Sequence, residues 1–535
     1  MQSIFNLKTS TDELESSNYG VSKDLYEQIT PSRDVTLANF PNGQISFKWQ
    51  TSGTKWFVPS KTYLRMRVKL TAADGVTALS RNTNISPNMD QFATLFQSAE
   101  FRINDKTVSR ISDYMGAIDA LDTRINKSRS WINSVGESSN FWNSYFHVRQ
   151  SDVTSDGEIY DGDGPALTNR DSLGYAGTTF ELTTAGLMTF SGGPNTNTVF
   201  IQGDSIEIVG ATGILIYFVQ NANADQTLKL VGPCTAIGAT ATNTWWLSRQ
   251  VNAAQRGIEY EITWCPPLSI FKVEHAIPCG RFELILNPQA SSVYQIAAVE
   301  STRVPLALTG GTNAFKFSVQ DMYCYINTVE GSRVDNLTYY LDLQQISCQA
   351  EAVGNNSFLQ KNFDVSPSTQ QICIAFQDDR VNTDTRYSCT RFRSYNNDAY
   401  PQLDVASTLN RLFINYAGVS KPSPDADPAF VPAAFNVGQV NKQTQRYVES
   451  LLASGSFHDT GGSESIEEWN RRGPYYLFNW SKDGNDRSTR VSVHHQFASA
   501  DVALHTRLLL FAISSQVAKV VISNGNVTDV QVEDV

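Results

Sequence analysis

The six histidines are the residues of this chain best suited to metal binding or acid–base chemistry, and only two of them are adjacent. They are His147, His275, His458, His494, His495 and His505. Consecutive side chains of a strand point to opposite faces of a sheet, so His494 and His495 should not reach one metal ion together. The chain also lacks a His-Glu-x-x-His motif, a Gly-x-x-x-x-Gly-Lys-Ser/Thr loop, a Gly-x-Ser-x-Gly elbow and a Rossmann glycine fingerprint. We therefore predict no catalytic residue, no metal site and no cofactor.

Carboxylates offer two further kinds of chemistry. The acidic segments 156–163 and 483–486 could collect calcium, but neither has the spacing of a calcium loop, and solvated turns explain them better. A carboxylate pair for glycoside hydrolysis could converge from distant strands. The predicted strand faces carry Lys, Arg, Ser, Thr and Gln more often than Asp or Glu, which disfavours such a cleft.

Four tryptophans are candidates for binding. Trp245 and Trp246 end a loosely patterned stretch, and Trp131 and Trp142 flank a loop that follows a predicted helix. Their rings could stack on sugars, or they could be buried between subunits or in an ordinary core. We favour burial and take these four residues as candidate inter-subunit contacts.

Charge and cysteine content limit the partners and the compartment. The formal net charge is −11, and residues 1–40 hold three basic and six acidic residues, a balance of −3. The chain therefore lacks a basic genome-binding arm, and we expect no direct sequence-specific nucleic-acid binding. Seven scattered cysteines and the absence of a visible secretory signal are typical of buried thiols in a reducing compartment.

Alternating strands must position these residues. The clearest strands have apolar side chains at every second position: Ile45, Phe47 and Trp49 in one, and Leu64, Met66, Val68 and Leu70 in the next. A period of two with polar residues between predicts antiparallel sheets that are buried on one face.

Helices are few. Apolar residues from Ile111 to Ile125 recur every three or four positions and predict a helix packed on a sheet, with Ser112 as its N-cap. Two short helices are expected later, one over 443–452 and one from Ser465, which forms a capping box with Glu468. The dipeptide Asn524-Gly525 predicts a closing hairpin.

The same order of features occurs twice. Residues 1–40 form a polar N-terminal arm, 41–330 a first unit with a large insertion near 150–255, and 331–535 a second unit with an insertion near 418–470. An insertion of about a hundred residues should fold as a protrusion with its own strands. The two halves share the order of their predicted elements and a similar local composition, although they do not align residue by residue.

This organisation resembles the double jelly-roll major capsid proteins of tailless icosahedral DNA viruses, of the virophage and polinton-like type. The segments that carry the resemblance are 56–68, 277–288 and the closing strand 508–511 with its hairpin. The fold class expected is all-β, with two consecutive eight-stranded antiparallel jelly-roll sandwiches, long loop insertions and a few short helices.

The resemblance implies a structural capsid protein that is not an enzyme. It implies a homotrimer that acts as a pseudo-hexameric capsomer, contacts neighbouring capsomers and penton or minor capsid proteins, and is located in the virion after assembly inside the host cell. Both insertions would then supply towers and inter-subunit contacts, and residues 1–40 an inner arm. The alternatives are a carbohydrate-binding or carbohydrate-active β-sandwich, and an adhesin or fibre subunit.

Overall fold

The computed structural model places most of the chain. The residues that it describes are 8–9, 24–35, 43–72, 91–136, 138, 167–169, 171–200, 205–210, 213–240, 244–248, 259–289, 315–353, 358–379, 389–390, 392, 409–421, 437–459, 464–466, 469, 473–480, 488–497 and 506–534.

The first β-sandwich consists of two four-stranded antiparallel sheets. One sheet has the order β15-β4-β17-β2 and the other the order β3-β16-β5-β6. The strands are β2 (Asp24–Ile29), β3 (Ile45–Thr51), β4 (Lys55–Ala72), β5 (Phe96–Ile103), β6 (Lys106–Ile111), β15 (Tyr260–Trp264), β16 (Gly280–Pro288) and β17 (Phe315–Glu330).

The second β-sandwich has the same composition, with orders β18-β25-β20-β23 and β19-β24-β21-β22. The short β1 (Lys8–Thr9) pairs with β18, and β26 (Asn526–Asp534) pairs with β25. The other strands are β18 (Leu337–Ala352), β19 (Phe358–Asp364), β20 (Thr369–Asp378), β21 (Leu409–Tyr416), β22 (Val419–Lys421), β23 (Tyr475–Asn479), β24 (Arg490–Phe497) and β25 (Thr506–Ser523).

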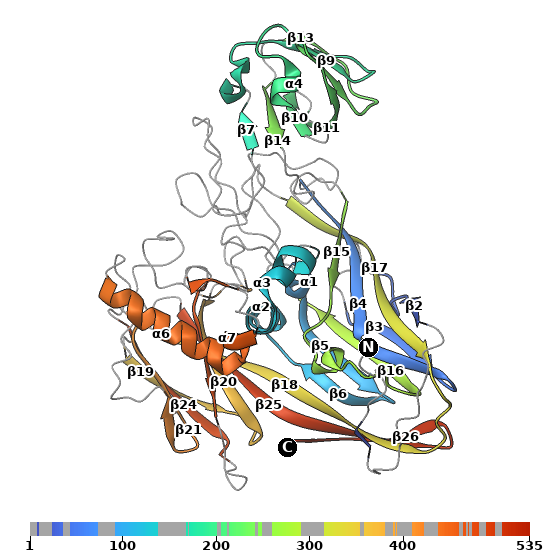
Figure 1. Ribbon diagram of the computed structural model, residues 1–535, viewed down its shortest axis with the longest axis vertical. Helices are drawn as coiled ribbons and strands as arrows, with labels where there is room; N and C mark the ends of the chain where they lie inside the picture. The colour runs from blue at the N-terminus through green and yellow to red at the C-terminus, as the bar shows by residue number, and fades with distance from the viewer. Residues whose placement is uncertain are drawn as a thin grey trace.

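Both sandwiches have one topology. If the eight strands of each are counted in chain order, one sheet reads first-eighth-third-sixth and the other second-seventh-fourth-fifth. This is the double Greek key of a jelly roll. The two jelly rolls lie side by side in Figure 1. The all-β prediction of two consecutive eight-stranded sandwiches is confirmed.

The alternating sequence pattern explains the strands. Ile45, Phe47 and Trp49 of β3 point inward, as do Leu64, Met66 and Val68 of β4, and all are buried. Their polar neighbours point to the outer faces. An aromatic cluster fills the first core, with ring centroids of Phe57 and Phe282 5.0 Å apart and Trp49 packed edge-on against Phe57.

Part of the expected N-terminal arm belongs to the first sandwich. Residues Asp24–Ile29 form β2, which pairs antiparallel with β17 from Asp24↔Val329 to Ile29↔Cys324. The prediction of an arm over 1–40 is corrected here, because without β2 the sheet would lack the first strand of the jelly roll.

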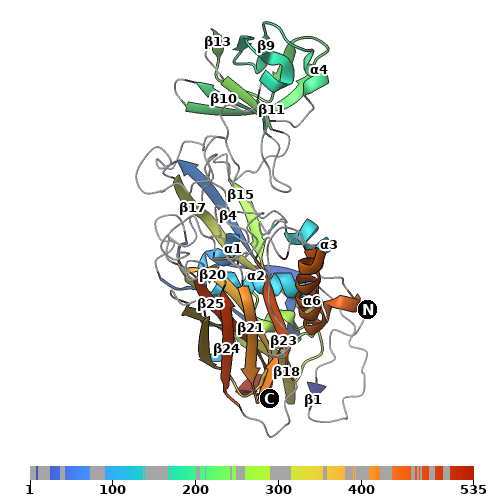
Figure 2. The same ribbon diagram turned by 90° about the vertical axis from the view of Figure 1, so that its left-hand side faces the viewer.

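A separate sheet lies within the first insertion. Its order is β13-β8-β9-β12-β11-β10-β14-β7, and it stands at one end of the molecule, apart from the sandwiches (Figures 1 and 2). We call it the protrusion. Its strands are β7 (Leu167–Asn169), β8 (Phe180–Leu182), β9 (Leu187–Phe190), β10 (Ser205–Gly210), β11 (Gly213–Ala222), β12 (Thr227–Leu230), β13 (Ile237–Thr240) and β14 (Thr244–Ser248).

Short helices complete the fold. In the protrusion they are η2 (Asp171–Tyr175) and α4 (Thr196–Val199). In the body they are α1 (Gln91–Thr94), α2 (Met115–Asn126), α3 (Arg129–Trp131), η1 (Ile132–Gly136), η4 (Ser269–Lys272), α6 (Val437–Ser454) and α7 (Ser456–Asp459). No helix among the described residues is long and apolar enough to cross a membrane.

Helix α2 differs from its prediction at its start and in its surroundings. It begins at Met115 rather than after Ser112, because strand β6 continues to Ile111 and Tyr114 adopts a left-handed conformation with φ 59°. Every residue from Met115 to Ile125 is buried, so the helix is enclosed rather than lying on a sheet with one solvated face.

The structure also contains the elements that the sequence predicts in the second unit. The expected helix 443–452 is part of the longer α6, and the Trp469 N–H donates to the Ser465 carbonyl at 2.9 Å, as expected for a helical turn that begins there. The closing hairpin is confirmed, with positive φ at Asn524 and Gly525 between β25 and β26.

We predict that truncation at the N-terminus becomes damaging only when β2 is removed. A chain lacking residues 1–22 should keep a melting temperature near that of the full chain, whereas a chain lacking 1–30 should melt much lower or aggregate, because the edge of β17 is exposed. Differential scanning fluorimetry of the two truncations tests this. Equal stability of both would show that β2 is dispensable.

Candidate functional site

The predicted contact residue Trp245 lies in the core of the protrusion. Its side chain has no exposed surface, and its ring centroid is 5.4 Å from that of Tyr175, 5.3 Å from Phe190 and 5.7 Å from Phe200. This ring therefore has no surface left for another subunit, which corrects the expectation of an inter-subunit contact there.

The other three predicted tryptophans are dispersed. Trp246 pairs in the ladder with Glu207 on one side and Asn169 on the other. Trp131 is half-buried at the end of α3, where the Lys127 ammonium lies 5.1 Å from its ring centroid. Trp142 lies outside the described residues. A subunit contact at these positions stays a prediction.

The histidine pair is divided between two faces of β24, as the strand period predicts. His495 is fully buried and meets the ring of Phe376 edge-on, while His494 stacks on Phe413 with centroids 4.3 Å apart. Burial above all, with the positive charges of Lys361 and His494, lowers the pKa of His495 to about 4. Within the described part of the chain, no group of three or more His, Cys, Asp or Glu could hold a metal ion. The acidic segments 156–163 and 483–486 lie outside it.

The seam between the two jelly rolls holds a buried polar site that the sequence did not indicate. Helix α2 of the first unit contacts α6 of the second. Nε of Arg124 in α2 is 2.8 Å from Oε1 of Glu464, and both side chains are almost completely buried. The guanidinium carbon also lies 4.9 Å from the ring centroid of Tyr475 and 5.3 Å from that of Phe392.

Apolar packing and hydrogen bonds continue along the seam. One hydrophobic cluster contains core residues of both sandwiches, from Val35 to Val530. The Ser456 hydroxyl donates to the Ile125 carbonyl at 3.0 Å, and the Asn104 amide donates to the Val527 carbonyl at 2.9 Å. The two jelly rolls are therefore joined by a shared core rather than by a linker alone.

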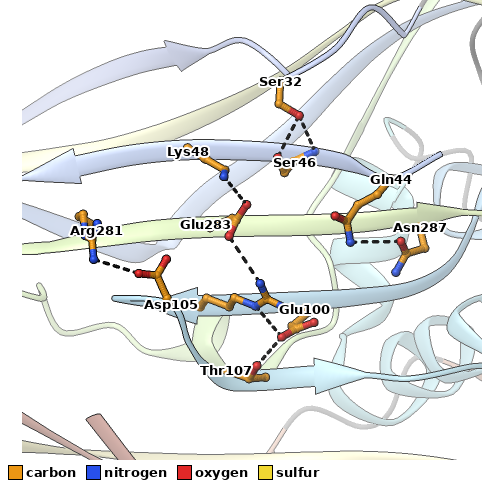
Figure 3. A network of polar contacts seen from close by, with 11 residues as sticks. Ser32, Gln44, Ser46, Lys48, Glu100, Asp105, Thr107, Arg281, Glu283 and Asn287 are labelled. Atoms are coloured by element: carbon orange, nitrogen blue, oxygen red, sulfur yellow. Dashed lines mark hydrogen bonds and ion pairs between the residues drawn. The ribbon is translucent and has the colours of Figure 1, made fainter. Parts of the chain in front are cut away.

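The outer face of sheet β3-β16-β5-β6 carries a cross-strand charge network (Figure 3). Glu283 lies between Lys48 Nζ at 3.1 Å and an Arg102 amino nitrogen at 3.8 Å. Arg102 Nε is 2.7 Å from Glu100. Burial raises the pKa of Glu100, but hydrogen bonds from Arg102 and Thr107 outweigh it and hold the pKa below its ordinary value. Opposite charges thus alternate across three strands on this face, and Thr107 of the fourth strand adds a neutral hydrogen bond.

The outer face at β2 is different, because it is aromatic. Tyr63 and Tyr325 stack with centroids 5.1 Å apart, and Tyr26 of β2 lies 6.2 Å from Tyr63 with 56% of its surface exposed. Leu25 is also exposed. An edge strand with exposed apolar side chains is suited to contact with another protein chain. The irregular spacing of these residues along the sequence gave no signal for this surface.

The geometry defines a double jelly roll without a recognisable catalytic constellation in its described part. No family profile matches the chain, and no curated protein matches it. Among solved structures, the chain is similar to one from the Sputnik virophage solved by cryo-EM, with a TM-score of 0.50, 12% identity, and coverage of 98% of this chain and 91% of that one. It is also similar to the mavirus major capsid protein, with a TM-score of 0.46, 10% identity, and coverage of 97% and 93%. At this identity the Sputnik likeness establishes the fold.

Replacing Trp245 should unfold the protrusion without affecting the sandwiches. Trp245→Ala removes the largest ring of a core that is separate from the body core, at a cost of about 3–5 kcal/mol. Limited proteolysis should then cut within 167–248, while the melting transition of the body stays in place. A single shared transition that moves as a whole would contradict the separation of the two cores.

His495 should make stability fall as the pH is lowered from about 6.5 to 4. The buried ring stays neutral in the folded state, whereas the unfolded chain takes up a proton below about 6.5, which costs up to about 3 kcal/mol. His495→Gln should lose this part of the pH dependence in urea unfolding. His494→Gln on the opposite face should keep most of it, because burial is the main cause of the lowered pKa. Identical pH profiles for His495→Gln and the unchanged chain would refute the assignment.

Breaking the buried ion pair should destabilise the seam strongly. Arg124→Met leaves Glu464 buried without its cation and should cost about 3–5 kcal/mol, whereas Arg124→Met combined with Glu464→Gln should recover most of the loss. Urea unfolding of the single and double variants measures this coupling. Lys48→Met, which removes the exposed partner of the half-buried Glu283, should change stability by less than about 1 kcal/mol.

Proposed function

We propose that this chain is the major capsid protein of an icosahedral DNA virus and that it trimerises into pseudo-hexameric capsomers. The observation that carries the proposal is the duplicated jelly roll with one shared core. Three such chains around a threefold axis present six sandwiches of the same topology, which is a six-sided block suited to tiling a shell.

The rigidity of the joint supports this role. Because close-packed side chains and a buried ion pair join the two sandwiches, the sandwiches keep a fixed spacing under lateral load. A flexible linker between them would not hold a hexagonal outline. The protrusion and the segment that contains α6 and α7 are insertions at the same connection of each jelly roll. The protrusion supplies the exterior, whereas α6 packs at the seam.

The burial of the aromatic residues favours a structural role over carbohydrate binding. Sugar stacking needs exposed aromatic rings around a concave site. Among the tryptophans whose side chains are described, Trp49, Trp56, Trp245, Trp264, Trp469 and Trp480 are buried and Trp131 is half-buried. The exposed Tyr26 lies on an edge strand, where we place a contact with a second copy of the chain.

The proposed partners follow from the capsomer. They are two further copies of the chain, neighbouring capsomers and penton or minor capsid proteins, in a virion assembled inside the host cell. The net charge of −11 favours a shell whose genome is condensed by other components rather than by this chain.

The solution mass tests the oligomer. Three chains of 59.3 kDa give about 178 kDa, and we expect this mass by light scattering after size exclusion at micromolar concentration. Tyr26→Glu should weaken the trimer because it places a charge in the contact, while Arg333→Glu at an exposed surface pair should leave the mass unchanged. A stable monomer of the unaltered chain would count against the capsomer and direct attention to glycan binding.

A further inference from the structure

A cavity of about 240 Å³ lies at the seam, beside the start of helix α2. Both jelly rolls contribute to its lining. The first unit provides the residues around Tyr114 and Met115, and the second provides Gln377, Cys389 and Arg507. It is smaller than the pockets that hold drug-sized ligands, so its occupant must be small.

Arg507 is a buried cation that has no anionic partner among the residues that the structure describes. Only 8% of its surface is exposed, and its Nε donates to the Gln377 Oε1 at 3.0 Å. The guanidinium carbon lies 5.4 Å from the ring centroid of Tyr114. Both partners are neutral, and no carboxylate of the described residues is within 4.0 Å of the guanidinium. Burying a charge in this way is costly unless a counter-ion offsets it.

The start of α2 adds donors to the same cavity. Its first helical bond is from the Ile118 N–H to the Tyr114 carbonyl, so the N–H groups of Met115, Gly116 and Ala117 precede the helical ladder. The side chain of the N-cap residue Tyr114 forms no capping hydrogen bond to the start of the helix. The positive end of the helix dipole and the Arg507 guanidinium therefore act on one small space.

We propose that this cavity binds a small singly charged oxyanion, such as a carboxylate or monobasic phosphate, between Arg507 and the start of α2. Asp113 sets the charge limit, because its carboxylate also lines the cavity while accepting the Tyr114 N–H at 2.8 Å. It repels a second negative charge on the ligand. The bound anion contacts both jelly rolls and so stabilises their association by linkage.

Acetate and inorganic phosphate are the probes, with chloride at the same ionic strength as the reference. The melting temperature of the full chain in its native oligomer should rise saturably with acetate and phosphate but not with chloride. Arg507→Met should weaken the apparent affinity at least tenfold, and Asp113→Asn should strengthen it several-fold. Arg281→Met, at an exposed pair with Asp105, is the matched control and should behave as the unaltered chain.

Cys389 gives a second readout that does not depend on melting. It is half-buried and forms no disulfide, and a Cβ added to Gly116 would lie 2.9 Å from its sulfur. Saturating acetate should slow its reaction with iodoacetamide several-fold, as followed by peptide mass spectrometry. If Arg507→Met does not fold, the Asp113→Asn affinity and this protection still decide the matter. The proposal is overturned if the melting temperature rises linearly with every salt and Asp113→Asn does not change this response. It is also overturned if saturating acetate does not slow the reaction of Cys389 with iodoacetamide.

Discussion

The joint between the two jelly rolls depends on a buried seam, and the seam depends on pairing the charge of Arg124. A guanidinium with about 1% exposure is tolerated in a core because Glu464 and two aromatic rings lie beside it. Helix α2 is enclosed on all sides as a result. The position of that helix also defines the adjoining cavity at Arg507.

The two insertions occupy equivalent positions in the two jelly rolls. In both jelly rolls the segment between the fifth and sixth strands is the one that expands, from β6 to β15 in the first and from β22 to β23 in the second. Each contains a helix at the seam, α2 or α6, and the two helices contact each other. The inner parts of equivalent connections thus lock the sandwiches, while the outer part of the first folds as the protrusion.

Sequence reasoning predicted the strands well and the site poorly. The alternation at Ile45, Phe47 and Trp49 depends on local period alone, and so does the Asn524-Gly525 turn. The start of α2 was misplaced because Tyr114 takes a left-handed conformation that no local pattern signals. Likewise, Arg124 and Glu464 are 340 residues apart in the sequence, and Arg507 and Gln377 are 130 residues apart. Only the folded chain brings these pairs together. Trp245 shows the converse error, because a ring taken as a candidate inter-subunit contact lies in the core of the protrusion.

Electron microscopy of the purified oligomer tests the central claim most directly. Class averages viewed down the symmetry axis should show three protomers that together form six similar densities in a closed hexagonal ring, with three protrusions on one face. Particles with one or two protomers, or elongated fibres without a closed ring, would contradict the capsomer account.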